Sequence, residues 1–294
     1  MEFNRKGTIM NLNSIRVLLS TSRPISWVNT AYPFIVGYLL LGGGADAMLI
    51  IGGLFFLIPY NLLMYGINDI YDYESDILNP RKGGVEGAIT PKSLHPLIMK
   101  SSILLSAPFI LWLIFQGSLV SNITLAIVIF FVVAYSLKGL RFKEIPVLDS
   151  ITSSTHFVGP LIYALSLFGF PPEAWPFVVA FFLWGVASQA FGAVQDILPD
   201  REGEISSIAT VFGARNTVWF AFANYLVCIL IILTQTTVTP LISIVLMTYL
   251  INISPFLSVT DKTSGLTRAG WKRFLWINYA VGAVITMTIM ARFV

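Results

Sequence analysis

Apolar stretches long enough to cross a lipid bilayer are the feature that most constrains this chain of 294 residues. Inside a bilayer the backbone must satisfy its own hydrogen bonds, so stretches of roughly 20 apolar residues fold as helices. About nine such stretches are predicted, at 24–43, 48–67, 99–116, 120–137, 147–168, 176–195, 216–235, 239–259 and 273–291. Because 56% of the residues are hydrophobic and only 11% are charged, the composition excludes an ordinary water-soluble domain. We expect an all-α integral membrane protein with about nine transmembrane helices bundled around a central apolar chamber.

The basic residues orient the chain in its membrane. With the stretches drawn as above, 17 of the 18 Lys and Arg residues fall on one side, and only Arg292 falls on the other. The positive-inside rule then predicts a protein of the cell (plasma) membrane whose N-terminus and polar loops are cytoplasmic and whose C-terminus is outside. Residues 1–23 lack the apolar core of a cleaved signal peptide and are predicted to form a cytoplasmic N-terminal segment. Residues 24–294 are predicted to form a single transmembrane domain.

The acidic residues lie on the same side as the basic ones. Only Asp46 and Glu173 fall outside, so 13 of the 15 Asp and Glu residues are cytoplasmic. A cation-coupled transporter would more often carry polar groups near the midplane and at both mouths. The single charged face therefore favours an enzyme and leaves a transporter as a remote alternative.

A cluster of oxygen-bearing side chains ends the second stretch, in the sequence Asn68-Asp69-Ile70-Tyr71-Asp72-Tyr73-Glu74-Ser75-Asp76. On a helix the asparagine and the three aspartates share one face, whereas the glutamate points elsewhere. Carboxylates that share a face beside a bilayer repel one another unless a cation lies among them. Oxygen-only ligands favour Mg²⁺, which takes phosphate oxygens as further ligands. The alternative is a solvated acidic helix end.

A second acidic cluster ends the sixth stretch, where Asp196, Asp200 and Glu204 are spaced four residues apart. Pro199 is expected to kink or break this helix. In both clusters an amide precedes an Asp-Ile pair, which hints at an internal duplication. We predict that the two clusters hold two Mg²⁺ ions, for which Mn²⁺ can substitute. The predicted catalytic and metal-binding residues are Asn68, Asp69, Asp72, Asp76, Asp196 and Asp200.

Basic side chains on the same side complete a phosphate site. The loop after the fourth stretch carries Lys138 and Arg141, and the loop after the first cluster carries Arg81 and Lys82. Such cations can hold a diphosphate and neutralise the charge of a leaving group. These four residues and Tyr135 are predicted to bind diphosphate, although cytoplasmic loops also carry Lys and Arg for topology alone.

These parts fit one chemistry. A diphosphate on an apolar chain ionises when cations stabilise the leaving group, and water would quench the resulting allylic carbocation. A chamber among membrane helices excludes water and admits lipid-like acceptors. Asn29 is predicted to contact the substrate or, alternatively, to bond to a neighbouring helix. Tyr65 and Tyr71 are predicted to bind the substrate, because aromatic rings stabilise cations.

The chain resembles the UbiA superfamily of intramembrane prenyltransferases, which has nine transmembrane helices and two aspartate-rich motifs, N-D-x-x-D-x-x-x-D and D-x-x-x-D. The first motif is matched by Asn68, Asp69, Asp72 and Asp76, and the second by Asp196 and Asp200. The resemblance extends from Arg23-Pro24 to the last apolar stretch. One departure is that Lys138 follows Tyr135 by three residues, whereas many members of the family place this lysine four residues after the tyrosine.

Two segments resemble the lycopene elongase branch of this superfamily: NDIYDYESDILNPRKGGVEG at 68–87 and FGAVQDILPDREGEISSIAT at 191–210. The resemblance implies transfer of dimethylallyl groups from dimethylallyl diphosphate to the ends of the C40 carotenoid lycopene, which makes C50 carotenoids. It implies Mg²⁺ as cofactor and, as partners, a prenyl diphosphate, a lipophilic acceptor, membrane lipids and other enzymes of carotenoid synthesis, but no nucleic acid.

Two questions stay open at this point. The same metal site would serve an aromatic acceptor of the quinone, haem or chlorophyll pathways, and it would accept a longer prenyl chain. His156, in the fifth stretch, is either a base for the final deprotonation or a polar group that bonds one helix to another.

Overall fold

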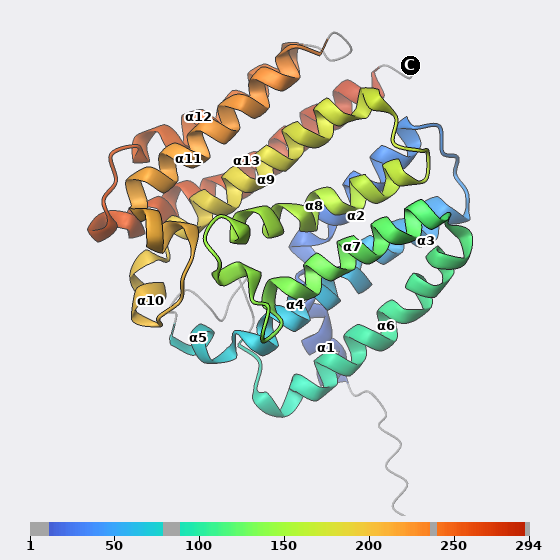
Figure 1. The fold of residues 1–294 in the computed structure, drawn as a ribbon, viewed down its shortest axis with the longest axis horizontal. Helices are drawn as coiled ribbons and strands as arrows, with labels where there is room; N and C mark the ends of the chain where they lie inside the picture. Colours follow the sequence, from blue (N-terminus) through green and yellow to red (C-terminus); the bar gives the residue numbers. More distant parts are fainter. Residues whose placement is uncertain (1–11, 79–88, 236–239, 292–294) are drawn as a thin grey trace, which may run out of the picture.

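The computed structural model describes residues 12–78, 89–235 and 240–291, and in these ranges the chain forms helices and no strands (Figure 1). The long helices are α2 (Trp27–Leu40), α3 (Ala47–Leu57), α4 (Pro59–Tyr71), α6 (His95–Gln116), α7 (Leu119–Ser136), α8 (Leu148–Ser166), α9 (Trp175–Val194), α11 (Ile208–Leu233), α12 (Pro240–Ile253) and α13 (Thr267–Met290). Shorter helices are α1 (Leu12–Thr21), α5 (Tyr73–Leu78) and α10 (Ile197–Glu202). The prediction of an all-α protein is confirmed.

Six helical stretches within the described ranges are long and apolar enough to cross a membrane. They are Ala47–Tyr71, Lys92–Gln116, Leu119–Ser136, Pro172–Val194, Ile208–Leu233 and Asp261–Met290. The other three predicted stretches correspond to α2, α8 and the shorter apolar segment Pro240–Phe256. The arrangement therefore agrees with the prediction of about nine spans.

Two of the spans contain breaks that hydropathy alone did not predict. The second span divides into α3 and α4 at Ile58, because the following Pro59 has no N–H to donate and restricts the residue before it. Helix α11 bends at Gly213, whose φ of 77° and ψ of 163° suit glycine. These two spans therefore contain a break in the helix and are not straight.

Two large hydrophobic cores divide the bundle between an N-terminal and a C-terminal half, and a small third cluster of Val158, Leu165 and Val178 joins α8 to α9. The first core lies mainly among α2, α3, α4, α7 and α8, and its buried rings are Phe34, Tyr38, Phe55, Phe56, Tyr60 and Tyr163. The second lies among α9, α11, α12 and α13. Figure 1 shows these groups as the lower and upper parts of the molecule, with α8 and α9 between them. Helices α8 and α9 approach closely at Gly185, where an added Cβ would lie 2.3 Å from Ser154 Oγ.

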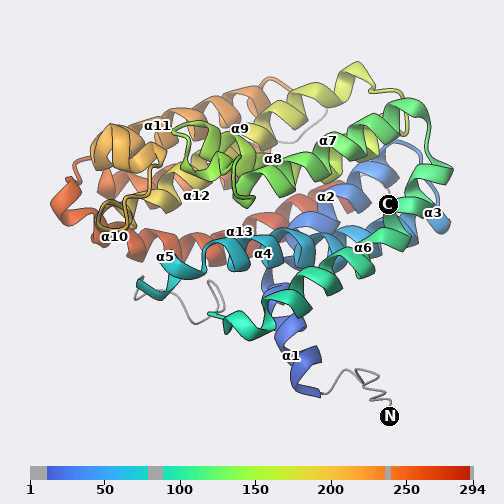
Figure 2. The same ribbon diagram turned by 60° about the horizontal axis from the view of Figure 1, so that its bottom comes forward.

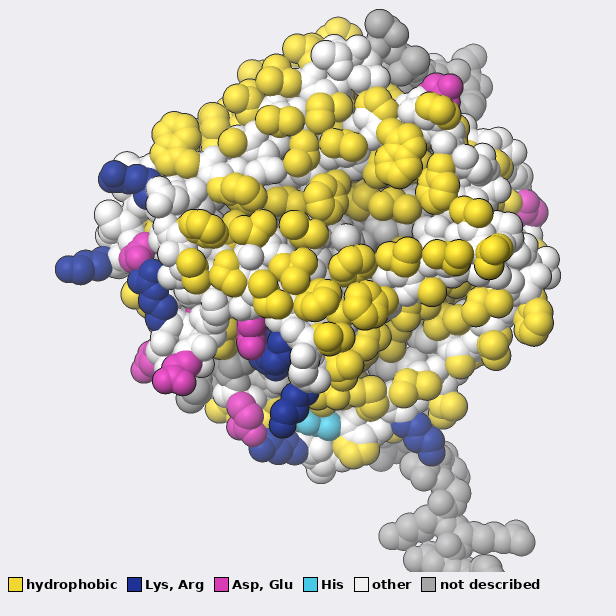
Figure 3. Space-filling view, in the orientation of Figure 1, with side chains coloured by type: hydrophobic (Ala, Val, Ile, Leu, Met, Phe, Trp, Pro, Cys, Tyr) yellow, Lys and Arg dark blue, Asp and Glu magenta, His cyan; other side chains and the backbone are white. Residues whose placement is uncertain are grey.

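The outer surface separates apolar from charged side chains. Figure 3 shows a broad hydrophobic band over the bundle, with most of the Lys, Arg, Asp and Glu side chains of that face gathered toward one end. Helix α1 projects from the body of the bundle and packs against α4 (Figure 2). An apolar band with a charged end is the surface of a multi-pass membrane protein.

Candidate active site

A cavity of about 920 Å³ lies between the two halves of the bundle. Helices α2, α4, α8, α9, α11, α12 and α13 all contribute to its lining. Polar groups of both acidic clusters also line it, namely Asn68, Asp72, Asp76, Gln195, Asp196 and Asp200. The fold thus brings together two clusters that lie far apart in the sequence.

The first cluster lies at a break between two helices. Helix α4 ends at Tyr71, Asp72 forms its C-cap with φ −97° and ψ −1°, and α5 begins at Tyr73. Two backbone bonds carry the i, i+4 register through the break: Asp72 N–H donates to Asn68 O at 2.9 Å, and Asp76 N–H donates to Asp72 O at 2.8 Å. Asp72 and Asp76 therefore remain one turn apart, and both reach the cavity.

Asp69 departs from the expected common face. It is 2% exposed and is not among the residues that line the cavity. Its Oδ1 accepts a hydrogen bond from Arg23 Nη2 at 2.7 Å. Arg23 does line the cavity, and its guanidinium lies 4.1 Å from the centre of the Tyr65 ring. Asp69 thus lies behind the cavity wall and holds the guanidinium of Arg23, which faces the cavity.

The loop after α7 brings two cations to Asp72. Lys143 lines the cavity and forms an ion pair with Asp72 Oδ1. Arg141 Nη2 lies 3.7 Å from the same oxygen, and Arg141 Nη1 donates to Tyr71 O at 3.3 Å. Arg141 also pairs with Glu144, and this hydrogen bond lowers the pKa of the Glu144 carboxyl.

The opposite oxygen of Asp72 is held by an amide. Asn68 Nδ2 donates to Asp72 Oδ2 at 2.7 Å and to Ser136 Oγ at 3.0 Å. This leaves the Asn68 carbonyl oxygen as the ligand-type atom of the side chain, because its amide nitrogen is already engaged.

The second cluster lies at a corresponding break. Helix α9 ends at Val194, Asp196 has φ −99° and ψ 1°, and α10 begins at Ile197. The break therefore precedes Pro199, which occupies the first turn of α10, where a missing N–H costs nothing. Asp200 N–H donates to Asp196 O at 2.8 Å, so these aspartates are also one turn apart.

Two neighbours of the second cluster differ from expectation. Glu204 is exposed, has a positive φ of 56° and does not line the cavity, so the third acid of this spacing leaves the helix. Gln195, in contrast, is buried and lines the cavity. Its Nε2 donates to Gly192 O at 3.0 Å, but its Oε1 has no hydrogen-bond partner in the protein. A buried acceptor without a donor is costly unless a ligand or cation meets it.

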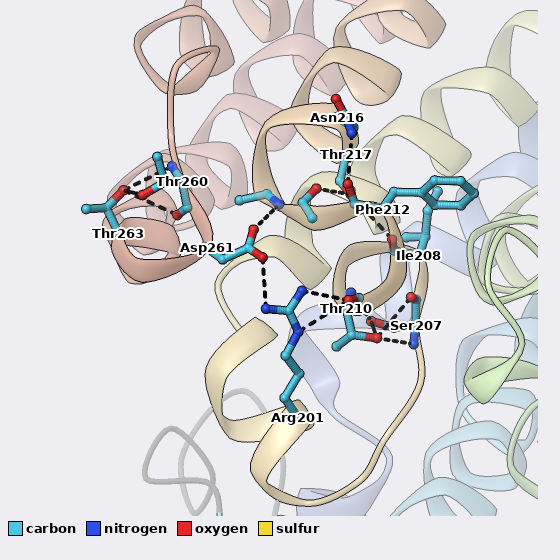
Figure 4. Close-up of polar contacts among 12 residues, drawn as sticks. Arg201, Ser207, Ile208, Thr210, Phe212, Asn216, Thr217, Thr260, Asp261 and Thr263 are labelled. Carbon is cyan, nitrogen blue, oxygen red and sulfur yellow. Dashed lines mark hydrogen bonds and ion pairs between the residues drawn. The ribbon is translucent and has the colours of Figure 1, made fainter.

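Figure 4 shows how α10 is fastened to its surroundings. Arg201 Nη2 donates to Thr210 O at 2.7 Å, and Arg201 Nη1 pairs with Asp261 Oδ2 at 2.8 Å. Asp261 Oδ1 accepts from the N–H of Ala214, just beyond the break at Gly213, at 2.7 Å. The Ala214 N–H, helped by Arg201, lowers the pKa of Asp261. This network ties α10 to α11 and to the segment before α13.

Asp149, at the start of α8, is a buried carboxylate that the sequence analysis did not single out. It lines the cavity, and its Oδ2 accepts from the N–H of Ile208, the first residue of α11, at 2.8 Å. Its Oδ1 accepts from Ser150 N–H at 2.6 Å. Asp149 therefore joins the start of α8 to the start of α11. This contact links residues that are far apart in the sequence, so the sequence alone did not indicate it.

The other predicted site residues fall into three groups. Those that line the cavity are Asn29, Tyr65, Tyr135 and His156. Those described but outside the lining are Tyr71, Lys138 and Arg141, and Lys138 is exposed. Arg81 and Lys82 lie outside the described residues. Cavity-lining polar residues that were not assigned beforehand include Arg23, Lys143, Asp149 and Gln195.

His156 lies in the wall of the cavity next to Tyr135. Its Nε2 is 3.4 Å from Phe131 O, and its ring meets Tyr135 edge-on at a centroid distance of 4.9 Å. Both predicted interpretations stay compatible with this position, because the ring bonds to a neighbouring helix and also faces the cavity.

The donor set suits Mg²⁺. Carboxylates from two clusters and the unpaired amide oxygen of Gln195 line one cavity, and all are hard oxygen ligands. Within the described ranges, no three His, Cys, Asp or Glu side chains converge into a ready-made metal group. This arrangement fits an ion that completes its shell with phosphate oxygens and water.

The family model described as the UbiA prenyltransferase family matches residues 30–279. The chain belongs to the UbiA prenyltransferase family. It is therefore a multi-pass membrane protein and a prenyltransferase, as predicted, and the transporter alternative is set aside.

Curated relatives in this family include a lycopene elongase/hydratase of Corynebacterium glutamicum, 48% identical over 95% of this chain and 98% of the relative. A C(50) beta-cyclic carotenoids biosynthesis protein, LbtBC, of a Dietzia species is 46% identical over 94% of this chain and 65% of the relative. A lycopene elongase/hydratase of Haloferax volcanii is 32% identical over 69% of this chain and 67% of the relative.

Solved UbiA structures share the fold. A UbiA homolog from Archaeoglobus fulgidus bound to GPP and Mg²⁺ matches with a TM-score of 0.64 and 18% identity, over 90% of this chain and 98% of that one. The same homolog bound to DMAPP and Mg²⁺ matches with a TM-score of 0.63 and 18% identity, over 91% and 99%. An apo UbiA homolog from Aeropyrum pernix matches with a TM-score of 0.60 and 18% identity, over 94% and 98%.

Proposed function

We propose that this UbiA-family protein transfers a dimethylallyl group from its diphosphate to lycopene, as a step in C50 carotenoid biosynthesis. The observation that carries the proposal is the cavity, which has two acidic clusters and cations at one end and is otherwise lined mainly by apolar side chains. The high identity to lycopene elongase/hydratases over nearly the whole chain supports the choice of acceptor.

The diphosphate end of the substrate binds at the acidic clusters. The residues that would hold Mg²⁺ are Asp72, Asp76, Asp196 and Asp200, with the amide oxygens of Asn68 and Gln195. Two ions, for which Mn²⁺ would substitute, would supply positive charge that stabilises the diphosphate leaving group.

The cations beside the first cluster take the remaining diphosphate charge. Arg23 and Lys143 face the cavity, and Arg141 stands behind Lys143 near Asp72. Asp69 acts through Arg23 by fixing the position of its guanidinium. Roles for Lys138, Arg81 and Lys82 in diphosphate binding stay predictions.

The reaction begins when the allylic C–O bond breaks and the electron pair leaves with the diphosphate. The dimethylallyl cation remains near the rings of Tyr65 and Tyr135, in a cavity from which apolar walls exclude water. The terminal double bond of lycopene attacks it, a C–C bond forms, and the new tertiary cation loses a proton or is captured by water. His156, on the same wall as Tyr135, is the nearby group able to take that proton.

The proposed location is the plasma membrane, with the N-terminus and the acidic clusters on the cytoplasmic side and the C-terminus outside. Residues 24–294 act as a single domain, and residues 1–23 form the cytoplasmic segment that precedes it. The substrate diphosphate then arrives from the cytoplasm, whereas the acceptor arrives through the lipid.

The test is pigment analysis in cells that accumulate lycopene and express either the wild type or Asp72→Ala. We expect C45 and C50 pigments from the wild type only. Unchanged lycopene, with the protein present in the membrane and dimethylallyl diphosphate available, would refute the lycopene assignment and favour an aromatic acceptor.

A further inference from the structure

A group of aromatic side chains covers the part of the cavity that belongs to the C-terminal half. We call it the aromatic wall and define it as Trp184 of α9, Tyr249 of α12, and Trp271 and Phe274 of α13. Trp271 stacks on Phe274 with a centroid distance of 4.9 Å and an interplanar angle of 15°. Phe274 stacks in turn on Trp184 at 6.0 Å and 23°, and Tyr249 meets Trp184 at 5.9 Å. The four rings form one continuous surface.

The wall offers ring surface but no charged side chain. The hydroxyl of Tyr249 donates to Asn278 Oδ1 at 2.9 Å, so this polar atom is already satisfied by the protein. Among the described residues, the lining contributed by α9, α12 and α13 contains no Lys, Arg, Asp or Glu. A phenol or carboxylate placed here would lose its water without gaining a charged partner, whereas a hydrocarbon would lose nothing.

One end of the wall lies beside the second acidic cluster. The ring of Trp271 packs against α9 at Gly192, where an added Cβ would lie 2.9 Å from Trp271 Cζ3. Gly192 precedes Asp196 by four positions, which is about one helical turn, or ~6 Å. Trp184 lies eight positions before Gly192 on the same helix, about 12 Å farther from the acids. The wall therefore leads away from the diphosphate end along the length of α9.

We infer that the aromatic wall is the acceptor subsite and that it takes a long, flat, conjugated hydrocarbon. The polyene lies along this group of rings, with its terminal double bond at the Gly192 end, next to the carbocation. This inference rests on the proposed function, because it names the place where the lycopene chain binds. Flat rings with a large apolar area and few free torsions suit a rigid conjugated chain without hydrogen-bonding groups.

The test compares substitutions in the wall with a matched substitution outside it. Trp184→Leu and Phe274→Leu remove two of the rings, whereas Trp276→Leu removes a tryptophan of α13 that is 77% exposed. Proteoliposomes carrying each variant receive lycopene at varied concentration with dimethylallyl diphosphate saturating, and then the reverse. We expect the apparent KM for lycopene to rise about tenfold in each wall variant, with KM for the diphosphate unchanged. Trp276→Leu is expected to match the wild type in both constants.

A second variant separates the ring face from the hydroxyl and protects the test against misfolding. Tyr249→Phe keeps the ring and loses only the bond to Asn278, so the apparent KM for lycopene is expected to stay within about twofold of the wild type. An unchanged KM for the diphosphate reports an intact acidic end in every variant. If the KM for the diphosphate changes in a leucine variant, that variant is replaced by Trp184→Phe or Trp271→Phe, which only reduce the ring area. These variants are expected to raise the lycopene KM by a smaller factor.

The outcomes distinguish the two proposals. A wild type that converts no lycopene overturns the proposed function and the wall together. A wild type that converts lycopene, with wall variants whose lycopene KM equals that of Trp276→Leu, overturns the wall alone. Equal rises in both KM values would also overturn it, because they indicate a general structural loss.

Discussion

The two acidic clusters share one backbone plan and differ in the charges around it. In each half a helix ends beside the cavity, one aspartate lies at the break and a second follows one turn later: Asp72 and Asp76 in the first half, Asp196 and Asp200 in the second. This common plan supports the hint of internal duplication. The two halves differ in what their neighbouring Lys and Arg side chains contact.

In the first half the cations face the cavity. Arg23 and Lys143 line the cavity and pair with Asp69 and Asp72. In the second half Arg201, next to Asp200, contacts Thr210 and Asp261 and supports the fold instead. Under the proposed function, the first half would balance the charge of the diphosphate, whereas the second would present oxygen ligands from a firmly held helix.

The largest expected effect is shared by both halves. Asp72→Asn and Asp196→Asn should each lower turnover by roughly 100- to 1,000-fold, because each removes a carboxylate that would hold Mg²⁺, whose positive charge stabilises the leaving group. The measurement is turnover in membranes at saturating substrates. Glu74→Gln, an exposed acid of the first cluster paired with Lys92, serves as control and should keep wild-type turnover. Equal effects of all three changes would contradict the assignment.

The next prediction separates the cations of the two halves. Lys143→Ala should raise KM for dimethylallyl diphosphate by about tenfold or more with little change in melting temperature, because the lysine faces the cavity. Arg201→Ala should lower the melting temperature, because α10 loses its bonds to Thr210 and Asp261. Enzyme kinetics measure the KM, and thermal unfolding in detergent measures the melting temperature, of both variants.

Lys138→Ala sharpens this comparison within a single loop. The exposed Lys138 should affect KM for the diphosphate less than Lys143, which lines the cavity. A larger effect from Lys138→Ala would show that the loop closes differently around the substrate.

A smaller effect is expected at the amide of the second half. Gln195→Leu should raise the Mg²⁺ concentration needed for half-maximal activity by about tenfold, because it removes the buried Oε1 that has no protein partner. Stabilisation of the substrate-free protein by Mn²⁺, followed as a shift in melting temperature, should weaken in parallel. Metal stabilisation equal to that of the wild type would refute a role for this oxygen.

The smallest expected effect concerns pH and the clamp of α10. The pKa of Asp261 is lowered from its ordinary value of 3.8, so its contribution to stability is complete well above pH 3.8 and is lost as pH falls below 3.8 through the lowered pKa. The melting temperature of the wild type should exceed that of Asp261→Asn at pH 7, and this difference should shrink toward pH 3. A difference that does not depend on pH would contradict the ionised form as the stabilising one.

Hydropathy predicted the number and approximate position of the spans, because bilayer thickness imposes a strict length. Motif spacing pointed to Asn68, Asp72, Asp76, Asp196 and Asp200, which the fold brings to one cavity. The orientation of Asp69 was not predictable, since the face argument assumed a straight helix and the chain bends at Asp72. The choice of Lys143 over Lys138 depends on Gly139 and Arg141, whose positive φ values of 98° and 41° redirect the loop. The sequence shows Gln195 beside Asp196, but its role as a ligand is suggested only by the structure, in which its Oε1 is buried without a hydrogen-bond partner.

The separate hydrophobic cores of the two halves have a consequence for engineering. Arg23 and Lys143 belong to the N-terminal half, and the whole aromatic wall belongs to the C-terminal half. The cations proposed to bind diphosphate and the proposed acceptor subsite are thus encoded in different stretches of the gene. Chimeras that join the N-terminal half of one relative to the C-terminal half of another at the α8–α9 connection should inherit pigment specificity from the C-terminal parent. Recombination at this one joint offers a direct route to new carotenoids.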